Sequence, residues 1–193
     1  MYFKTPLAII AMLLACALSA PAQANKCALK IAELKQAPEL YGLRLGMTTD
    51  QARAVVPAIQ ASPRDDIGFA TTSFSPDFNP QIDKAAFAGV RTVSLEFLDG
   101  KLFTLWIGFN SSYKWKTLEE FVPGMSTALG LPTGAWVVSS AKHTLECADV
   151  QLVASMIAQG PSIRLTDKSA KELWEQRRTE REEKRTAESE DEP

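Results

Sequence analysis

The sequence is poor in the residues and motifs that common enzyme classes require. It contains a single histidine, His143, among 193 residues. It also lacks the GxSxG, HExxH, glycine-rich phosphate-loop and dinucleotide-binding patterns. His143 and Cys147 lie four residues apart in a predicted strand, which separates them by roughly 13 Å and prevents a direct nucleophile–base pair. We therefore expect no cofactor and no catalytic residues of these types, although two carboxylates distant in sequence leave hydrolysis as an alternative.

The chain also lacks an excess of positive charge. It has 21 Lys and Arg residues against 23 Asp and Glu residues, and its pI is about 5.6. Because contacts with phosphates need clustered Lys and Arg, this composition argues against nucleic acid as a partner. Asp65, Asp66, Asp77 and Asp83 do not follow the spacing of an EF-hand loop, so we interpret them as a solvated acidic loop rather than a metal site.

Long apolar runs are absent except at the N-terminus. The run PLAIIAMLLACALSA follows Lys4, is too short for a comfortable membrane span, and precedes the small-residue pattern Ala22-Gln23-Ala24. These features predict a signal peptide over residues 1–24 and a mature chain that begins at Asn25. We expect export to the periplasm or the extracellular space, with no membrane span. The LLAC sequence leaves an alternative, a lipoprotein anchored through Cys16.

Cysteine is also scarce, with three residues in the chain. Removal of the signal peptide leaves Cys27 and Cys147, an even pair in an oxidising compartment, which favours a disulfide. Two cysteines and His143 supply too few ligands for a zinc site, so we expect no metal. A reactive thiol remains the alternative interpretation of these cysteines.

The stretch LRLGMTTDQARAVVP contains the signals of a short helix. Thr48 and Gln51 have the spacing of a capping box, and Met47 can pack on Ala52 as a hydrophobic staple. Pro57 ends the pattern, because its ring opposes the preceding turn. A helix of about two turns is marginal alone in water, so it must pack on another element.

A β-hairpin over residues 90–109 is the predicted partner of this helix. Asp99-Gly100 is a turn signal in VSLEFLDGKLFTLWIGF. We predict a three-residue loop, Leu98-Asp99-Gly100, because that register builds one apolar face. The face would consist of Val93, Leu95, Phe97, Phe103, Leu105 and Ile107.

Two tryptophans are the candidate binding residues. Trp106 should point to the opposite, polar face of the hairpin, together with Thr92, Ser94, Glu96 and Thr104. An exposed tryptophan on such a face is typical of a binding anchor, although a loop or a terminal segment could cover it. Trp136 is the second candidate.

The second half of the chain predicts one more helix and four strands. Thr117 and Glu120 form a capping-box pattern, Gly130 and Pro132 end the helix, and Pro123 should kink it. The strand-like segments AWVVSSA, HTLEC, VQLVASMI and SIRLT follow. Together these elements predict an α+β fold, with short helices packed on one face of an antiparallel β-sheet.

The chain divides into a signal peptide, an N-terminal segment, a single α+β domain and a charged, partly disordered tail: residues 1–24, 25–39, 40–174 and 175–193. Within the domain, residues 58–88 predict a loop in which FATTSF forms an edge strand. Near the tail, Ala170, Leu173 and Trp174 can dock one helical turn. Glu180 and Lys184 could then support an exposed helix, and we expect the final ESEDEP to be disordered.

Residues 41–110 resemble the helix-and-hairpin element of secreted bacterial proteins with the β-lactamase-inhibitor-protein or SmpA/OmlA-like fold. The resemblance rests on LRLGMTTDQARAVVP followed by the hairpin VSLEFLDGKLFTLWIGF. It implies a small α+β domain that acts in binding or envelope assembly. We therefore expect a secreted, non-catalytic module that binds an unknown protein or envelope component. The alternative is a carboxylate-dependent hydrolase that acts on cell-envelope material.

Overall fold

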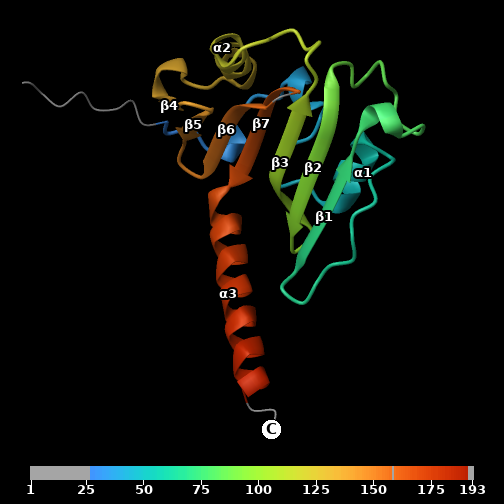
Figure 1. Cartoon of the computed structure of the whole chain (residues 1–193), viewed down its shortest axis with the longest axis vertical. Helices are drawn as coiled ribbons and strands as arrows, with labels where there is room; N and C mark the ends of the chain where they lie inside the picture. Colours follow the sequence, from blue (N-terminus) through green and yellow to red (C-terminus); the bar gives the residue numbers. More distant parts are fainter. Residues whose placement is uncertain (1–26, 158, 191–193) are drawn as a thin grey trace, which may run out of the picture.

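The computed structural model describes residues 27–157 and 159–190, and within them it shows one seven-stranded antiparallel sheet with three α-helices (Figure 1). The predicted α+β class is confirmed. The strands lie in the order β1-β2-β3-β7-β6-β5-β4. They span Phe69–Phe74 (β1), Val90–Leu98 (β2), Lys101–Phe109 (β3), Val137–Ser139 (β4), Lys142–Glu146 (β5), Val150–Ile157 (β6) and Gly160–Asp167 (β7). The helices are α1 (Thr49–Val55), α2 (Leu118–Leu129) and α3 (Lys168–Glu190), and the 3-10 turns are η1 (Ile31–Glu33), η2 (Pro38–Leu40), η3 (Pro76–Phe78) and η4 (Thr133–Ala135).

The predicted signal peptide, its cleavage before Asn25 and the alternative anchor at Cys16 all lie outside the described residues. Within the described part of the chain, no helix is both long enough and apolar enough to cross a membrane.

The sheet has one packed face and one open face. Because side chains alternate along a strand, residues such as Val93, Leu95 and Ile107 point into the buried core. Figure 1 shows the N-terminal segment on the far side of the sheet, whereas β2, β3 and β7 stand uncovered toward the viewer. The open face therefore presents the alternate, mostly polar positions of the central strands.

The helix α1 is joined to the hairpin at its first residues. The predicted capping box is present, since Thr48 Oγ1 accepts a bond from the Gln51 amide at 3.2 Å and Gln51 Oε1 accepts one from the Thr48 amide at 2.9 Å. The amide of Gly46 donates to the Leu102 carbonyl, and the Leu102 amide donates to the Met47 carbonyl, both at 2.8 Å. The Gly-Met pair thus forms a short bridge to β3, which fixes where α1 begins.

The predicted three-residue hairpin loop is wrong. Leu98 pairs with Lys101, so the loop contains only Asp99 and Gly100. Their φ angles are +50° and +78°. Positive values at both central residues are what a type I′ turn requires, and this turn matches the twist of the two strands.

A β-bulge at Phe103 keeps the apolar residues on one face despite the shorter loop. Glu96 pairs with Thr104 while Phe97 pairs with Leu102, so Phe103 is the extra residue on β3. Leu102 consequently takes the core position that we predicted for Phe103. Phe103 turns to the other side of the sheet, where it packs against α3.

Replacing Gly100 with alanine should lower the free energy of unfolding by about 1 kcal/mol, because the left-handed conformation costs roughly 1–2 kcal/mol for a residue with a Cβ atom. The new Cβ would also lie 2.6 Å from Arg64 Nη2, but that flexible side chain can move. Urea denaturation measures the difference. Gly100→Asn should lose less, since asparagine tolerates this backbone better. Equal midpoints for the wild type and Gly100→Ala would contradict a strained turn.

The helix α2 begins and ends where the sequence predicts. Thr117 Oγ1 accepts a bond from the Glu120 amide at 3.3 Å, and Gly130 ends the helix with a φ of +72°. The helix continues across Pro123, and a Cβ atom on Gly124 would overlap the ring of Trp115. Its buried face consists of Leu118, Phe121, Val122, Met125, Ser126 and Leu129.

Two tyrosines pack in the core beside α2 and the N-terminal segment. The ring of Tyr41 stacks on Phe87 with centroids 4.8 Å apart, and Tyr113 stacks on Phe109 at 4.0 Å. Burial raises the pKa of Tyr41 to about 12 and also raises the pKa of Tyr113, because a phenolate there would lose its hydration.

The mature chain that we expect contains only these two tyrosines, so its ultraviolet titration should show no tyrosinate step near pH 10. Both folded-state pKa values exceed the unfolded value of about 10. The neutral rings therefore contribute stability that is complete below pH 10 and is lost as the pH rises through about 12. The urea-unfolded chain should titrate near pH 10. A step at that pH in the folded protein would show that the rings are solvated.

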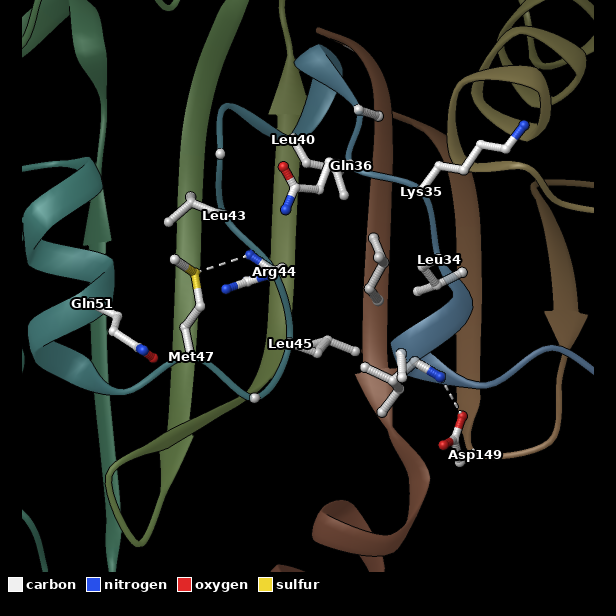
Figure 2. Close-up of a pocket in the computed structure, with 16 residues that line it drawn as sticks. Leu34, Lys35, Gln36, Leu40, Leu43, Arg44, Leu45, Met47, Gln51 and Asp149 are labelled. Carbon is white, nitrogen blue, oxygen red and sulfur yellow. Dashed lines mark hydrogen bonds between the residues drawn. The ribbon is translucent and has the colours of Figure 1, made fainter.

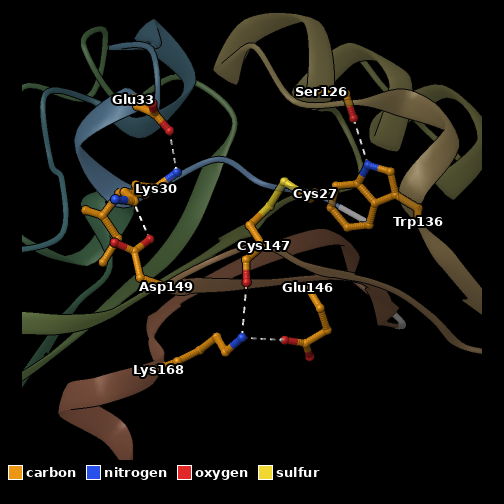
Figure 3. Close-up of a disulfide and its surroundings, with 10 residues drawn as sticks. Cys27, Lys30, Glu33, Ser126, Trp136, Glu146, Cys147, Asp149 and Lys168 are labelled. Carbon is orange, nitrogen blue, oxygen red and sulfur yellow. Dashed lines mark hydrogen bonds and ion pairs between the residues drawn. A yellow bond between two sulfur atoms is a disulfide. The ribbon is translucent and has the colours of Figure 1, made fainter. Parts of the chain in front are cut away.

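The predicted disulfide joins Cys27 to Cys147 across 120 positions of sequence, with Cα atoms 4.4 Å apart (Figure 3). Both sulfur atoms are used in this bond, which removes the basis for a reactive thiol. Close by, the Ile31 amide donates to Asp149 Oδ1 at 2.7 Å. The N-terminal segment is thereby held against the connection between β5 and β6.

The helix α3 is longer than the sequence indicated. We expected one docked turn around Trp174, an exposed helix supported by Glu180 and Lys184, and disorder from Glu188, but the helix continues to Glu190. Asp191–Pro193 lie outside the described residues. Trp174 packs on Phe69 and Phe103 with ring centroids 5.6 and 6.3 Å apart. The expected Glu180–Lys184 pair is replaced, because Gln176 donates to Glu180 and Lys184 pairs with Glu188.

Two arginines fasten the middle of α3 to the domain. Arg177 Nη1 lies 3.0 Å from Asp99 Oδ2 in the hairpin turn. Arg181 Nη1 lies 3.1 Å from Asp65 Oδ2 and 2.9 Å from Asp66 Oδ1. Its hydrogen bond holds the pKa of Asp66 below the usual value. These contacts bring together residues about 80 to 115 positions apart, which explains why local sequence gave no sign of them.

Candidate binding face

Trp106 lies near the middle of the open face, on β3. Its direct cross-strand partners are Ser94 on β2 and Arg164 on β7. Ser94 and the tryptophan are half-buried, whereas Arg164 is exposed. The predicted placement of Trp106 on the polar face of the hairpin is therefore confirmed. We use the name Trp106 face for the surface formed by Arg91, Ser94, Trp106 and Arg164.

Arg91 and Gly108 fix the position of the tryptophan ring. The guanidinium carbon of Arg91 lies 5.7 Å from the ring centroid, within the range of a cation–π interaction. A Cβ atom on Gly108 would lie 2.6 Å from Trp106 Cη2 and 2.8 Å from Arg91 Nη2. Only glycine leaves room for both side chains to cross this point of β3. The ring is thus held between a neighbouring cation and the bare backbone beneath it.

Sequence reasoning missed Arg91 for an identifiable reason. By simple alternation, Arg91 should share the core face with Val93. A register shift between Val90 and Thr92 makes Arg91 an extra residue, so its side chain reaches Trp106 instead. Arg91 Nε is buried and donates no hydrogen bond to the described residues. Gly108 could have been recognised from the sequence, because a glycine inside a strand commonly marks a place where other groups approach the backbone closely.

Short hydroxyl side chains continue the open face beside Trp106. Thr92, Gly108, Ser162 and Ser155 follow one another across β2, β3, β7 and β6. The Ser155 and Ser162 hydroxyls lie 2.8 Å apart, and the Thr92 hydroxyl lies 3.2 Å from that of Ser75. Because these side chains are short and already paired, they form a low polar surface from which Trp106 and the two arginines project.

The structure does not bring Trp136 to the Trp106 face. Trp136 packs against the core, and its Nε1 donates to Ser126 Oγ of α2 at 2.9 Å (Figure 3). His143, on β5, pairs with Val138 and Ala154, and it has no thiol to activate because Cys147 is in the disulfide.

The acidic residues of the 58–88 region are dispersed. Asp65 and Asp66 are bound by Arg181, whereas Asp83 Oδ1 accepts the amide of Ala85 in a local turn. Across the part of the chain that the structure describes, no three His, Cys, Asp or Glu side chains gather in the manner of a metal site.

Comparison of this chain with protein-family models, with curated protein sequences and with solved structures finds no match.

Proposed function

We propose that this protein is an exported, non-catalytic binding module, and that its Trp106 face contacts a protein partner. The observation that supports this most directly is the placement of Trp106 and Arg91 over Gly108, on a region of the sheet that no described helix covers. Tryptophan and arginine are enriched among the residues that dominate binding energy at protein interfaces. Because packing already restrains the ring, little conformational entropy is lost on binding.

The charges of the Trp106 face favour an acidic group on the partner. Arg91 and Arg164 lie on either side of Trp106, whereas Ser94, its cross-strand partner on β2, is neutral. A guanidinium can bind a carboxylate through two parallel hydrogen bonds, which supplies orientation as well as attraction. We therefore infer that an Asp or Glu side chain of the partner lies beside Trp106.

Export is part of this proposal and is supported by the disulfide. Disulfides persist in oxidising compartments such as the periplasm and the extracellular space. The signal-peptide pattern of residues 1–24 also indicates export. The resemblance of residues 41–110 to β-lactamase-inhibitor-protein and SmpA/OmlA-like domains also fits a binding module in the cell envelope.

Site-specific photo-crosslinking in the producing cells tests the proposal. A photoreactive residue replaces Ser94, the half-buried cross-strand neighbour of Trp106, and a matched chain has it at exposed Ala54 on α1. We expect one discrete protein adduct from position 94 and none from position 54. The adduct should disappear when Trp106→Ala is added to the chain that is labelled at position 94.

Binding to the captured partner then separates the two tryptophans. Trp106→Ala should weaken binding by about 30-fold or more, the effect of an interface hot spot. Trp136→Phe should leave binding unchanged, because Trp136 packs on the core side. An adduct that persists without Trp106, or equal labelling from both positions, would refute the Trp106 face as the binding site.

A further inference from the structure

Two of the surface hollows differ in what they offer to a ligand. The larger, of about 610 Å³, lies between residues 31–37 and 42–47 (Figure 2). Four of its five leucines have 6% or less of their surface exposed, so it presents little apolar surface. The smaller, of about 520 Å³, lies beside the outer edge of β1 and includes strand backbone that has no partner. We call the smaller one the β1 hollow.

The backbone N–H and C=O of Ser73 point outward from the sheet, toward the β1 hollow. Two residues earlier, the Thr71 carbonyl accepts the Ser62 amide at 2.9 Å, and the Thr71 amide donates to Ser62 Oγ at 3.0 Å. Both groups of Thr71 therefore face away from β2. Because inward and outward bonding alternate along an antiparallel strand, those of Ser73 face the same way. No described residue bonds to them, and Ser73 lines the hollow.

The open part of this edge is only one residue long. On one side, Ser62 occupies the edge at Thr71. On the other side, the Ser75 carbonyl accepts the amides of Phe78 and Asn79 at 3.1 and 3.2 Å. A peptide that adds to a sheet as a strand pairs with several successive residues of the edge, which these neighbours prevent. A compact ligand that offers one donor and one acceptor side by side fits the opening better.

The side chains around Ser73 are polar and neutral. Among the described residues that line the β1 hollow, none is charged. Gln60 and Gln81 belong to the lining and are exposed. A carboxamide carries two N–H donors and an acceptor oxygen, so it can bond to a hydroxyl in either direction. This composition favours a neutral ligand rich in hydroxyl groups over an ion.

Phe78 gives the β1 hollow an exposed aromatic surface. Its side chain is 89% exposed, the largest value among the large apolar residues that the structure describes. The preceding Pro76 of η3 is buried, which anchors the turn that carries the ring. Packing an apolar surface of a ligand on this ring would remove both surfaces from water, which is favourable. A sugar ring has such a surface, because its faces carry C–H groups while its hydroxyls project from the edge.

We propose that the β1 hollow binds a neutral hexopyranose with two adjacent equatorial hydroxyls, such as a glucose unit of a glycan. One hydroxyl accepts the Ser73 N–H and its neighbour donates to the Ser73 carbonyl, since a hydroxyl can do either. The C–H face of the ring packs on Phe78, and the carboxamides of Gln60 and Gln81 bond to the remaining hydroxyls. The site shares no residue with the Trp106 face, so it does not depend on the function proposed there.

Nuclear magnetic resonance titration of the isotope-labelled, disulfide-bonded mature chain with cellotriose, a trimer of glucose, tests the proposal. We expect saturable shifts of the Ser73 backbone amide signal and of the Gln60 and Gln81 side-chain amide signals. The amide signal of Ser94, on the Trp106 face, should not move. Cellotriose that is methylated at every hydroxyl keeps its rings but cannot donate, so it should bind roughly tenfold more weakly or less. Trialanine, the probe for an extended peptide, should cause no shift.

Two variants remove separate parts of the site. Phe78→Ala should weaken cellotriose binding by about five- to tenfold, through loss of the aromatic contact. Ser73→Pro should weaken it by a similar factor, because proline has no N–H and is tolerated where a strand edge faces outward. Val138→Ala is the matched control and should have no effect, since Val138 is an exposed apolar residue of β4, at the opposite end of the sheet.

Thermal unfolding checks that each variant is folded, and the exposed position of Phe78 makes Phe78→Ala the decisive one. Absence of shifts with cellotriose or equal binding of the methylated sugar would overturn the proposal. An unchanged affinity in Phe78→Ala would also overturn it. Shifts of the Ser73 amide with trialanine but not with cellotriose would show that the edge accepts a peptide instead of a sugar.

Discussion

Replacing Cys27 and Cys147 together with serine should lower the free energy of unfolding by about 2–5 kcal/mol, the range typical of the loss of a native disulfide. The bond closes a loop of 120 positions of sequence. For a loop of that length, the entropy removed from the unfolded chain gives an upper value of roughly 5 kcal/mol at 25 °C. The loss should be well above that of an ordinary surface substitution, which is usually within about 0.5 kcal/mol.

Urea denaturation of the oxidised wild type and the double variant measures this difference. Addition of a reductant should bring the wild type to the midpoint of the variant and should not change the variant itself. Thiol titration of unfolded, unreduced protein should find no free thiol in the exported mature chain. Two free thiols in that protein, or the same midpoint for both chains, would show that the disulfide does not contribute as the structure indicates.

Phe121→Ala should cost about 3–5 kcal/mol of stability, as is typical of a buried phenylalanine replaced by alanine. Phe121 is fully buried on α2. Its ring lies 5.6 Å from that of Phe109, 5.7 Å from that of Trp115 and 6.4 Å from that of Tyr113. Removing it would leave a cavity between α2 and the sheet, which rigid neighbours on both sides cannot close.

Phe78→Ala provides the matched control, because it removes the same atoms from a side chain that is 89% exposed. That variant should change the free energy of unfolding by no more than about 0.5 kcal/mol. Urea denaturation followed by tryptophan fluorescence compares the two proteins, and near-ultraviolet circular dichroism should change only in Phe121→Ala. Similar losses from both substitutions would contradict the packing of α2 on this aromatic cluster.

The candidate binding face was only partly predictable. Trp106 could be placed on the polar side of the hairpin because strand side chains alternate with a period of two. The same rule misplaced Arg91, since a register shift between Val90 and Thr92 interrupts the alternation. Arg164 comes beside Trp106 only because β7 pairs with β3. The composition of the Trp106 face thus depends on strand order, which no local pattern specifies.

Features that depend on a few neighbouring residues were determined by the sequence itself. The caps at Thr48 and Thr117 fix where α1 and α2 begin, because each threonine hydroxyl accepts the amide three residues later. Gly130 ends α2 because glycine adopts the left-handed conformation without a Cβ clash. The pairing of Cys27 with Cys147 followed from counting the cysteines that remain after export.

Features that depend on contacts between distant residues were decided only by the tertiary structure. The hairpin turn is the two-residue Asp99-Gly100, because a bulge at Phe103 restores the apolar face that a longer loop would have provided. Arg177 and Arg181 fasten α3 to the hairpin turn and the 65–66 loop, although the helix itself has almost no apolar face. In each case folding brings together residues that are distant in the sequence. A short stretch of sequence does not contain both partners, so it cannot predict their interaction.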